Sequence, residues 1–413
     1  MSKLSNNEAP RGKPPLADQV FAEPCEARNA ILSIAASATE DPPCGKPQGL
    51  MAKKGQIPWF EPLIEADDAE AVKRQTLTGF VNEGPANRAF EQILLDYFKM
   101  PYAVTMPSCT VALALTLMAL GIRRGDTVLV PDVTFIGTAN AVRLAGGEPI
   151  LVDIDPANFT MDPKDAGRRL QPSTKVILFV YLNGRSGNIE ALRSLAREKG
   201  LLLIEDAAEA LGSRNAEGFL GTLSEAGCFS LAPTKIITSG QGGFVLTRRQ
   251  DIRDQLVRLK DHGRLSRESD VHATTGFNFK VTDLQAALAI SQFSKLKRRI
   301  ERSREIDRRY REGLADIPEI EFIARNLEGG FLMWPDFKCR RRDELVKHLL
   351  AQNIILRPFW PAIHTQPAYA AQGSFPGATE ACRHACWLPC SPAITDQQVD
   401  RVIASLKLFF GRG

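Results

Sequence analysis

Cysteine is scarce in this sequence, with 8 residues among 413. So few thiols in so long a chain exclude a disulfide-stabilised scaffold, and we expect them to stay reduced. Long apolar runs are also missing, since nothing approaches the roughly 18 residues that span a bilayer. The opening MSKLSNNEAPRGKPPL lacks the hydrophobic region of a secretory signal. These absences predict a cytoplasmic protein that makes no membrane contact.

Neither sign of charge is in excess, because 52 basic and 48 acidic side chains leave a net charge of +4. A balance so close to zero gives no electrostatic reason to expect nucleic acid or an anionic membrane as a partner. Composition therefore leaves the function open, and local motifs have to supply it.

The paired CxxC spacing of structural zinc sites is absent near the C-terminus. Cys382, Cys386 and Cys390 are four residues apart with His384 among them, a spacing that would align them on one helix face. Pro389 interrupts any such helix. We therefore predict no metal site.

A chain of 413 residues suits two domains rather than one. Residues 1–50 are rich in Pro, Ala, Glu and Asn without sustained periodicity, so we expect a flexible extension. Regular alternation of strand and helix patterns follows, and after a long helical segment it gives way to shorter elements with Pro-rich turns. We predict a large domain over 51–296 and a small C-terminal domain over 297–413.

Apolar strand patterns alternate with amphipathic helix patterns through the large domain. Strands are expected at Val128–Pro131, Ile150–Ile154, Val176–Leu182, Leu201–Ile204 and Phe244–Thr247. Helices are expected at Asp67–Thr78, Asn87–Phe98, Ser108–Leu120 with Ser108 as N-cap, Thr138–Leu144, Pro163–Leu170 and Ile189–Lys199. This alternation predicts an α/β fold with a mostly parallel sheet covered on both faces. Ligands bind such sheets at the carboxyl ends of the strands.

A further segment, Thr282–Leu314, has the periodicity of one long helix or of two joined helices. Within it Lys295–Arg311 carries nine basic and three acidic residues. We interpret this excess as a solvated helix face rather than a phosphate contact.

Lys235 is the main candidate for chemistry. It lies among small, apolar and hydroxyl residues, with no acidic residue within nine positions on either side. A partly desolvated amine of this kind loses its proton readily and can form a Schiff base with an aldehyde. Taken alone, the pattern also suits a surface lysine beside a turn.

Two further stretches supply candidate cofactor contacts. Glu205 and Asp206 follow the strand Leu201–Ile204, so one of them should face a ligand, although an Asp there also suits a helix cap. Such an Asp could pair with a protonated pyridine nitrogen. Ser108 opens a helix with small residues, whose free backbone N–H groups suit a phosphate.

Taken together and in this order, the motifs resemble the DegT/DnrJ/EryC1/StrS family of sugar aminotransferases, which depend on pyridoxal phosphate (PLP). The resemblance runs from about Ile57 to Leu406. Its motifs are Asn82-Glu-Gly-Pro with Phe90-Glu91, Ser108-Cys-Thr-Val-Ala-Leu, Gly125-Asp-Thr-Val-Leu-Val-Pro with Thr134-Phe135, Val152-Asp-Ile-Asp-Pro, Ile204-Glu-Asp-Ala-Ala-Glu-Ala-Leu-Gly, Phe229-Ser230 with Lys235, His262-Gly263, Gly276-Phe-Asn-Phe-Lys-Val-Thr-Asp-Leu-Gln-Ala-Ala, and Arg357-Pro with His364-Thr-Gln-Pro-Ala-Tyr. The family implies PLP-dependent fold type I, with a seven-stranded type of sheet and a smaller C-terminal α/β domain.

By this resemblance Lys235 is the Schiff-base lysine, Asp206 the partner of the pyridine nitrogen, and Phe135 the ring that stacks on the cofactor. Glu209 stands where relatives carry Gln, His or Glu near the cofactor's phenolic oxygen, where a carboxylate and a phenolate repel each other unless one holds a proton. Lysine at position 235 argues against the branch that carries His and dehydrates sugars.

The phosphate contacts follow in the same way. Cys109, Thr110 and Ser230 are implied as its donors, and Asn278 as a donor from the neighbouring subunit, which implies a homodimer with shared active sites. Cys109 is a departure, because the family usually has Gly there, and Gln241 stands where Glu is common. Arg357 and His364 are candidate substrate-binding residues.

The implied reaction moves an amino group from glutamate or glutamine to a keto sugar, in the first place a nucleotide-linked keto-deoxysugar of amino-sugar biosynthesis. An aminotransferase acting on a cyclitol or another carbocyclic ketone is the alternative, and a non-catalytic regulatory protein on the same fold is a second. A nicotinamide oxidoreductase is disfavoured, because Gly240-Gln-Gly-Gly243 lacks the third glycine of the dinucleotide motif and precedes a strand.

Overall fold

The computed structural model describes residues 55–266, 269–325, 330–369 and 373–412. The helices and strands named below belong to one compact unit, Leu50–Gly413. The expected extension over residues 1–50 lies outside the described residues, and the expected domain division near residue 297 stays a prediction. Within the described ranges no helix has the length and apolar character needed to cross a membrane.

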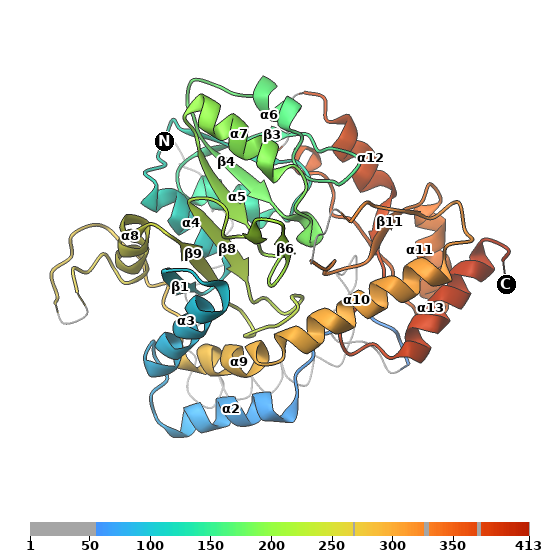
Figure 1. Ribbon diagram of the computed structural model, residues 1–413, viewed down its shortest axis with the longest axis horizontal. Helices are drawn as coiled ribbons and strands as arrows, with labels where there is room; N and C mark the ends of the chain where they lie inside the picture. The colour runs from blue at the N-terminus through green and yellow to red at the C-terminus, as the bar shows by residue number, and fades with distance from the viewer. Residues whose placement is uncertain (1–54, 267–268, 326–329, 370–372, 413) are drawn as a thin grey trace, which may run out of the picture. The chain divides into compact units, whose positions relative to one another are not determined.

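A seven-stranded sheet forms the centre of this unit, in the order β1-β9-β8-β5-β4-β2-β3 (Figure 1). Its strands are β1 (Tyr102–Met106), β2 (Thr127–Pro131), β3 (Glu148–Val152), β4 (Thr174–Val180), β5 (Leu202–Asp206), β8 (Ala226–Ser230) and β9 (Gly243–Thr247). Strand β9 is antiparallel to β1 and β8, whereas the pairs from β8 through β5, β4 and β2 to β3 are parallel. The apolar runs of β2 and β8 are buried along their whole length. The expected mostly parallel sheet is confirmed.

Helices between the parallel strands cover both faces of the sheet. Helix α5 (Gly137–Leu144) packs on β2 and β3, and α7 (Ile189–Lys199) packs on β4 and β5. The two crossovers run in opposite directions along the sheet, and crossovers are right-handed, so their helices cover opposite faces. The connections that leave β2 and β4 run in opposite directions along the sheet, so the strand order reverses between these two strands. Ligands bind beyond the carboxyl ends of the strands at such a point.

Several element boundaries differ from those expected. Ser108 caps helix α4 (Cys109–Ala119) as predicted, because its Oγ accepts a hydrogen bond from the Val111 N–H at 3.2 Å. The strand expected over Val176–Leu182 ends at Val180, and the 3₁₀ turn η2 (Leu182–Gly184) follows it. Strands β1 and β8 were not expected. The same is true of α8 (Gln250–Lys260), and α6 (Pro163–Arg168) is shorter than predicted.

The segment Thr282–Leu314 forms two helices, α9 (Asp283–Phe293) and α10 (Leu296–Gly313), rather than one. Helix α9 packs against α2 (Ala66–Leu77) and α3 (Pro85–Phe98) (Figure 1). The carboxylate of Asp283 accepts the backbone N–H groups of Gly84, Ala86 and Asn87 at 2.8–3.0 Å. These amides have no partner inside their own helix, so Asp283 satisfies the N-terminus of α3 from a neighbouring helix.

The C-terminal part contains a four-stranded antiparallel sheet in the order β10-β11-β13-β12. Its strands are β10 (Glu321–Phe322), β11 (Asp336–Lys338), β12 (Arg357–Pro358) and β13 (Ala385–Trp387). Helix α13 (Asp396–Phe409) packs on α10 and on α11 (Arg342–Ala351), and α12 (Pro376–His384) precedes β13 (Figure 1). The remaining short elements are β6 (Arg214–Asn215), β7 (Gly218–Phe219) and the 3₁₀ turn η3 (Ile363–Thr365).

The basic side chains of α10 form ion pairs with acidic residues. Lys295 bridges Glu65, Asp67 and Asp68 at 2.6–3.3 Å. Arg309 pairs with Asp396 and Asp400. These pairs join this segment to α2 and α13, and the Lys295 side chain, which precedes α10, is 10% exposed, so the expected solvated face does not include it.

Candidate active site

One cavity of about 320 Å³ lies beyond the carboxyl ends of the parallel strands. Among its lining residues are most of the predicted site residues, namely Cys109, Thr110, Phe135, Asp206, Glu209, Ser230, Lys235 and Arg357. They come from segments up to 248 positions apart in the sequence, as the numbers of Cys109 and Arg357 show. The strand ends of the large sheet and one strand of the small sheet thus meet at this cavity.

The N-terminus of α4 supplies two backbone donors to the cavity. The N–H groups of Val111 and Ala112 bond to Ser108, whereas those of Cys109 and Thr110 have no acceptor in the described part of the chain. A helix N-terminus with free N–H groups favours an anion. Cys109 is the first helical residue and does not have a positive φ, so its position does not require glycine.

Asp206 ends β5 and is buried. Its Oδ2 accepts the Thr138 hydroxyl at 2.8 Å and its Oδ1 accepts the Ala208 N–H at 3.1 Å. Burial raises the pKa of this carboxyl to about 6, against the lowering effect of these two donors. The thiol of Cys109 lies 3.9 Å from Oδ1.

Glu205, the other carboxylate of the pair, is not in the cavity lining. Its carboxylate accepts the Tyr181 hydroxyl, the N–H groups of Gly221 and Leu223, and the Ser224 hydroxyl. It therefore fixes the loop before β8, and Asp206 is the member of the pair that faces the cavity.

Lys235 lines the same cavity. Its Nζ is 3.4 Å from Oε1 of Glu209 and 4.9 Å from the centre of the Trp334 indole ring. The Lys235 side chain is 12% exposed, so the interpretation as an ordinary surface lysine is wrong. Its acidic partner, Glu209, lies 26 positions before it in the sequence, beyond the nine positions on either side of Lys235 that contain no acidic residue.

Phe135 is 53% exposed although it lines the cavity, and its ring centre lies 5.8 Å from that of Trp360. Gly137 packs closely against it, because a Cβ there would lie 2.7 Å from Thr110 Oγ1 and 3.0 Å from the Phe135 ring. An exposed aromatic face in a cavity suits stacking by a flat ring.

Arg357 adds a cation to the cavity. Its guanidinium carbon lies 4.4 Å over the Trp59 ring, and burial alone lowers the pKa of the group. No carboxylate in the described ranges pairs with it. The indole N–H groups of Trp59 and Trp334, both buried, likewise have no acceptor among the described residues. An unpaired guanidinium in a cavity is expected to bind an acceptor group of a ligand.

Two predicted residues lie outside this cavity. Asn278 is exposed, and its backbone bridges Asp261. The His364 Nδ1 contacts Asp132 Oδ2 at 2.5 Å, and its ring stacks on Phe375 with centres 4.8 Å apart. Both contacts of His364 are structural, and Asn278 makes no contact with the cavity of its own chain.

The arrangement meets the chemical requirements of PLP. Free amides at the start of α4 suit its phosphate, Asp206 suits a protonated pyridine nitrogen, and the Lys235 amine suits its aldehyde. The exposed face of Phe135 in the cavity suits its ring. The residues present therefore fit the cofactor that the sequence motifs imply.

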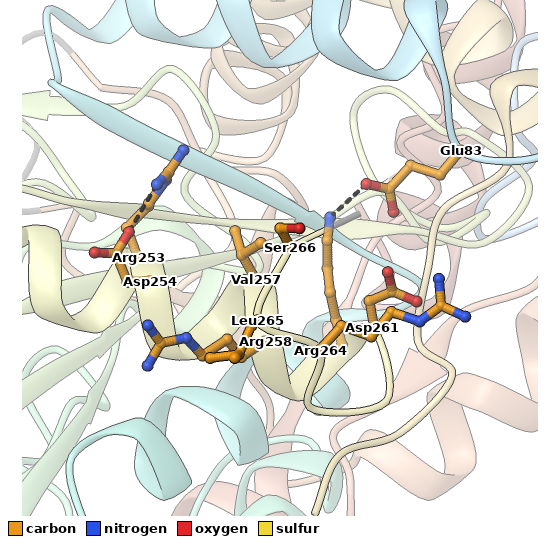
Figure 2. A pocket seen from close by; sticks show the side chains of 10 residues that line it. Glu83, Arg253, Asp254, Val257, Arg258, Asp261, Arg264, Leu265 and Ser266 are labelled. Carbon is orange, nitrogen blue, oxygen red and sulfur yellow. Dashed lines mark hydrogen bonds and ion pairs between the residues drawn. The ribbon is translucent and has the colours of Figure 1, made fainter. Parts of the chain in front are cut away.

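A second cavity, of about 250 Å³, lies beside α8 and contains none of the predicted residues. Its charges are largely paired: Glu83 bonds to the buried Lys260 at 3.2 Å, and Arg253 bonds to Asp254 at 2.7 Å (Figure 2).

The metal-ligand candidates are dispersed. The Cys386 thiol contacts the Phe337 carbonyl and the Cys390 thiol contacts the Trp59 carbonyl. In the described ranges, the acidic group with metal-like spacing is Glu65, Asp67 and Asp68, and Lys295 already neutralises it. The six described cysteines are free thiols.

Sequence reasoning missed several lining residues, among them Thr138, Trp59, Trp334 and Trp360. Thr138 was expected only as a helix start, and nothing local connects it with Asp206. The tryptophans carried a weak signal, since the chain has four and three of them line this cavity.

Comparison with known proteins gives consistent results. Residues 62–407 match the DegT/DnrJ/EryC1/StrS aminotransferase family. GDP-perosamine synthase of Vibrio cholerae is 30% identical over 366 residues, which cover 86% of this chain and 99% of the relative.

Solved structures agree with that match. DesV of S. venezuelae, in complex with a ketimine intermediate, has a TM-score of 0.80 and 31% identity, covering 84% of this chain and 95% of DesV. DesI, in the presence of its TDP-sugar product, has a TM-score of 0.79 and 27% identity, covering 86% of this chain and 94% of DesI.

Proposed function

Since this chain belongs to the DegT/DnrJ/EryC1/StrS aminotransferase family, we propose that it moves an amino group from glutamate or glutamine to a nucleotide-linked keto sugar. The observation that carries the proposal is the meeting of Lys235, Asp206 and the α4 N-terminus in one cavity. The GDP-linked and TDP-linked sugars named for the relatives support a nucleotide on the substrate.

The family is PLP-dependent, and bound PLP supplies an electron-poor ring that accepts the electron pair of a breaking C–H bond. Asp206 would keep the proton on the ring nitrogen. The N–H groups of Cys109 and Thr110 and the hydroxyl of Ser230 would bind the phosphate, and Phe135 would cover one ring face.

Lys235 would act as the covalent attachment point and, once displaced by an amine substrate, as the base that takes a proton from the donor carbon. Glu209 would orient this amine, because its Oε1 lies 3.4 Å from Nζ. The contact also gives Glu209 a cationic neighbour, which offsets the expected repulsion between this carboxylate and a phenolate.

Arg357 would bind an anionic part of the substrates, because it is a cation in the cavity with no carboxylate partner in the described ranges. His364, which contacts Asp132, would hold the segment that follows Arg357 rather than touch substrate. We therefore propose a positioning role for His364 in place of the direct substrate contact expected from the sequence.

The chain would work as a homodimer in which Asn278 serves the partner's phosphate site. Two observations support this role: Asn278 is exposed, and it contacts no part of its own chain's cavity. The expected cytoplasmic location stays a prediction.

A panel of ketones tests the proposal. Purified protein loaded with pyridoxamine phosphate is mixed with GDP-linked and TDP-linked keto-deoxysugars and with a keto-inositol, and the amino products are identified by mass spectrometry. Amination of a nucleotide-linked sugar supports the proposal. Amination of the keto-inositol alone supports the cyclitol alternative, and binding of PLP without amination of any ketone favours the regulatory alternative.

A further inference from the structure

Two groups flank the amine of Lys235. The Glu209 carboxylate lies 3.4 Å from Nζ, and the Trp334 ring centre lies 4.9 Å from it. Glu209 comes from the loop after β5, and Trp334 from the segment before β11. Since these segments are far apart in the sequence, something must hold them in a fixed relation around the amine.

Asn183, in η2, bonds to both of them. Its backbone N–H donates to Oε2 of Glu209 at 2.7 Å. Its side-chain Oδ1 accepts the backbone N–H of Trp334 at 2.7 Å, and its Nδ2 donates to the backbone carbonyl of Trp334. The amide side chain thus pairs with both polar atoms of one peptide residue, as a neighbouring strand would.

The backbone of Asn183 makes these contacts possible. It has a left-handed conformation, with φ 57° and ψ 24°, in a fully buried position. Asn tolerates this region better than most residues. The following residue, Gly184, approaches the carbonyls of Phe331 and Glu209 so closely that a Cβ would lie 2.7 Å and 3.1 Å from them.

Asp336, on β11, anchors the far side of the arrangement. The Asn183 Nδ2 also donates to Asp336 Oδ2 at 2.8 Å, and Arg185 holds both Asp336 oxygens at 2.8 and 2.5 Å. The Arg185 and Asp336 side chains are fully buried. The turn after β4 is therefore fixed to the start of β11 in the small sheet, just after Trp334.

We propose that Asn183 is a positioning residue that holds Glu209 and Trp334 against the amine of Lys235 and thereby sets the reactivity of that amine. The inference rests on the proposed role of Lys235. It assigns Asn183 no contact with substrate or cofactor, since Asn183 does not line the cavity.

The test uses Asn183→Gly, which tolerates the left-handed backbone and keeps the backbone N–H that bonds to Glu209. It removes the side-chain bonds to Trp334 and Asp336 and so tests the Trp334 side of the arrangement. The matched control is Asn353→Gly, because Asn353 is an exposed residue with a similar φ of 59°. Protein stripped of cofactor is treated with formaldehyde and borohydride, and methylation of each lysine is followed by mass spectrometry. Lys260, 3% exposed, serves as the internal reference for an intact fold.

We expect Lys235 in the Asn183→Gly protein to be methylated at least about fivefold faster than in the wild type, because fivefold corresponds to losing one hydrogen bond and the variant loses the three that the Asn183 side chain makes to Trp334 and Asp336. Lys260 should keep its rate, and the Asn353→Gly protein should match the wild type at both lysines. An unchanged Lys235 rate in folded protein, or equal acceleration of Lys235 and Lys260, overturns the proposal.

A second variant covers the case in which Asn183→Gly does not fold. Asn183→Ser leaves less empty space, and its hydroxyl is too short to pair with both polar atoms of Trp334. If neither variant folds, Asn183 is a folding residue and the positioning role is wrong.

A kinetic measurement separates this inference from the proposed function. In complete turnover, Asn183→Gly should lower kcat and leave the KM for the amino donor within about twofold, because the residue touches no substrate. A wild-type protein inactive with every donor would refute the proposed function, whereas the methylation result, which needs no substrate, would still decide the role of Asn183.

Discussion

Asp206 is a buried carboxyl group inside the cavity, where it accepts hydrogen bonds from the Thr138 hydroxyl and the Ala208 amide. In the Asp206→Asn variant a neutral amide replaces the charge that would hold a proton on the cofactor ring. Turnover should fall by about 10²-fold or more. Cofactor content, measured by absorbance after gel filtration, should change little because the phosphate contacts remain. Full turnover in a variant with normal cofactor content would make Asp206 a structural residue.

The same carboxyl predicts a pH dependence of stability in cofactor-free protein. Its pKa is about 6 in the folded chain against 3.8 in the unfolded chain, so between these values the folded state binds more protons. Stability contributed by this group is therefore present at pH 4 and is lost as pH rises through 6, by about 3 kcal/mol in total.

Urea unfolding of cofactor-free wild type and Asp206→Asn, at pH 4.5 and pH 7.5, isolates this effect. The variant cannot titrate there, so its stability relative to wild type should rise between the two pH values. A relative stability that does not change, or that falls, would show that the Asp206 pKa is not raised.

At the scale of elements, Asp283 connects two helices through hydrogen bonds that helix propensity does not predict. It is the first residue of α9, yet its carboxylate accepts three N–H groups at the N-terminus of α3. Asp283→Ala leaves these buried donors without an acceptor and should lower the free energy of unfolding by about 2–4 kcal/mol.

Asp343→Ala is the control for this prediction, because Asp343 also lies in the first turn of a helix but is 77% exposed in its pair with Arg342. Its cost should stay within about 0.5 kcal/mol. Equal costs for the two variants in urea unfolding would mean that the Asp283 bonds contribute nothing beyond an ordinary surface acid.

Local sequence patterns predicted the elements that neighbouring residues in the sequence are enough to stabilise. The Ser108 cap, the buried strands β2 and β5 and the helix α7 follow from periodicity and capping chemistry. The left-handed turn at Asn183 has no local signal, because the bonds that stabilise it come from Trp334 and Asp336, about 150 positions later. The split between α9 and α10 at Ser294 likewise depends on packing.

For the candidate site, the order of the motifs along the chain identified the main residues, whereas contacts between residues far apart in the sequence could not be predicted. Lys235 and Asp206 were identified by their strand-end and small-residue surroundings, and both line one cavity. The partners Glu209 and Thr138 of these groups depend on how strands and loops meet in space. Such contacts arise from long-range packing, so a single sequence without the fold does not reveal them.

At the scale of the whole molecule, the proposed homodimer predicts that two defective chains can form one good site. Lys235→Ala removes the amine from a chain's own cavity, and Asn278→Asp places a carboxylate where the partner's phosphate would bind, which should repel it. Each variant alone should be inactive. In a mixed dimer one site combines the intact Lys235 of one chain with the intact Asn278 of the other, and the second site carries both defects.

Co-refolding equal amounts of the two variants should therefore recover activity, up to about a quarter of wild type if the chains pair at random in a two-fold symmetric dimer. The motive is the exposed position of Asn278, outside the cavity of its own chain. Two affinity tags on the two variants allow the mixed dimer to be purified and counted before turnover is measured. If purified mixed dimers are as inactive as the parent variants, Asn278 does not act across the interface, and each cavity must hold its phosphate with residues of one chain alone.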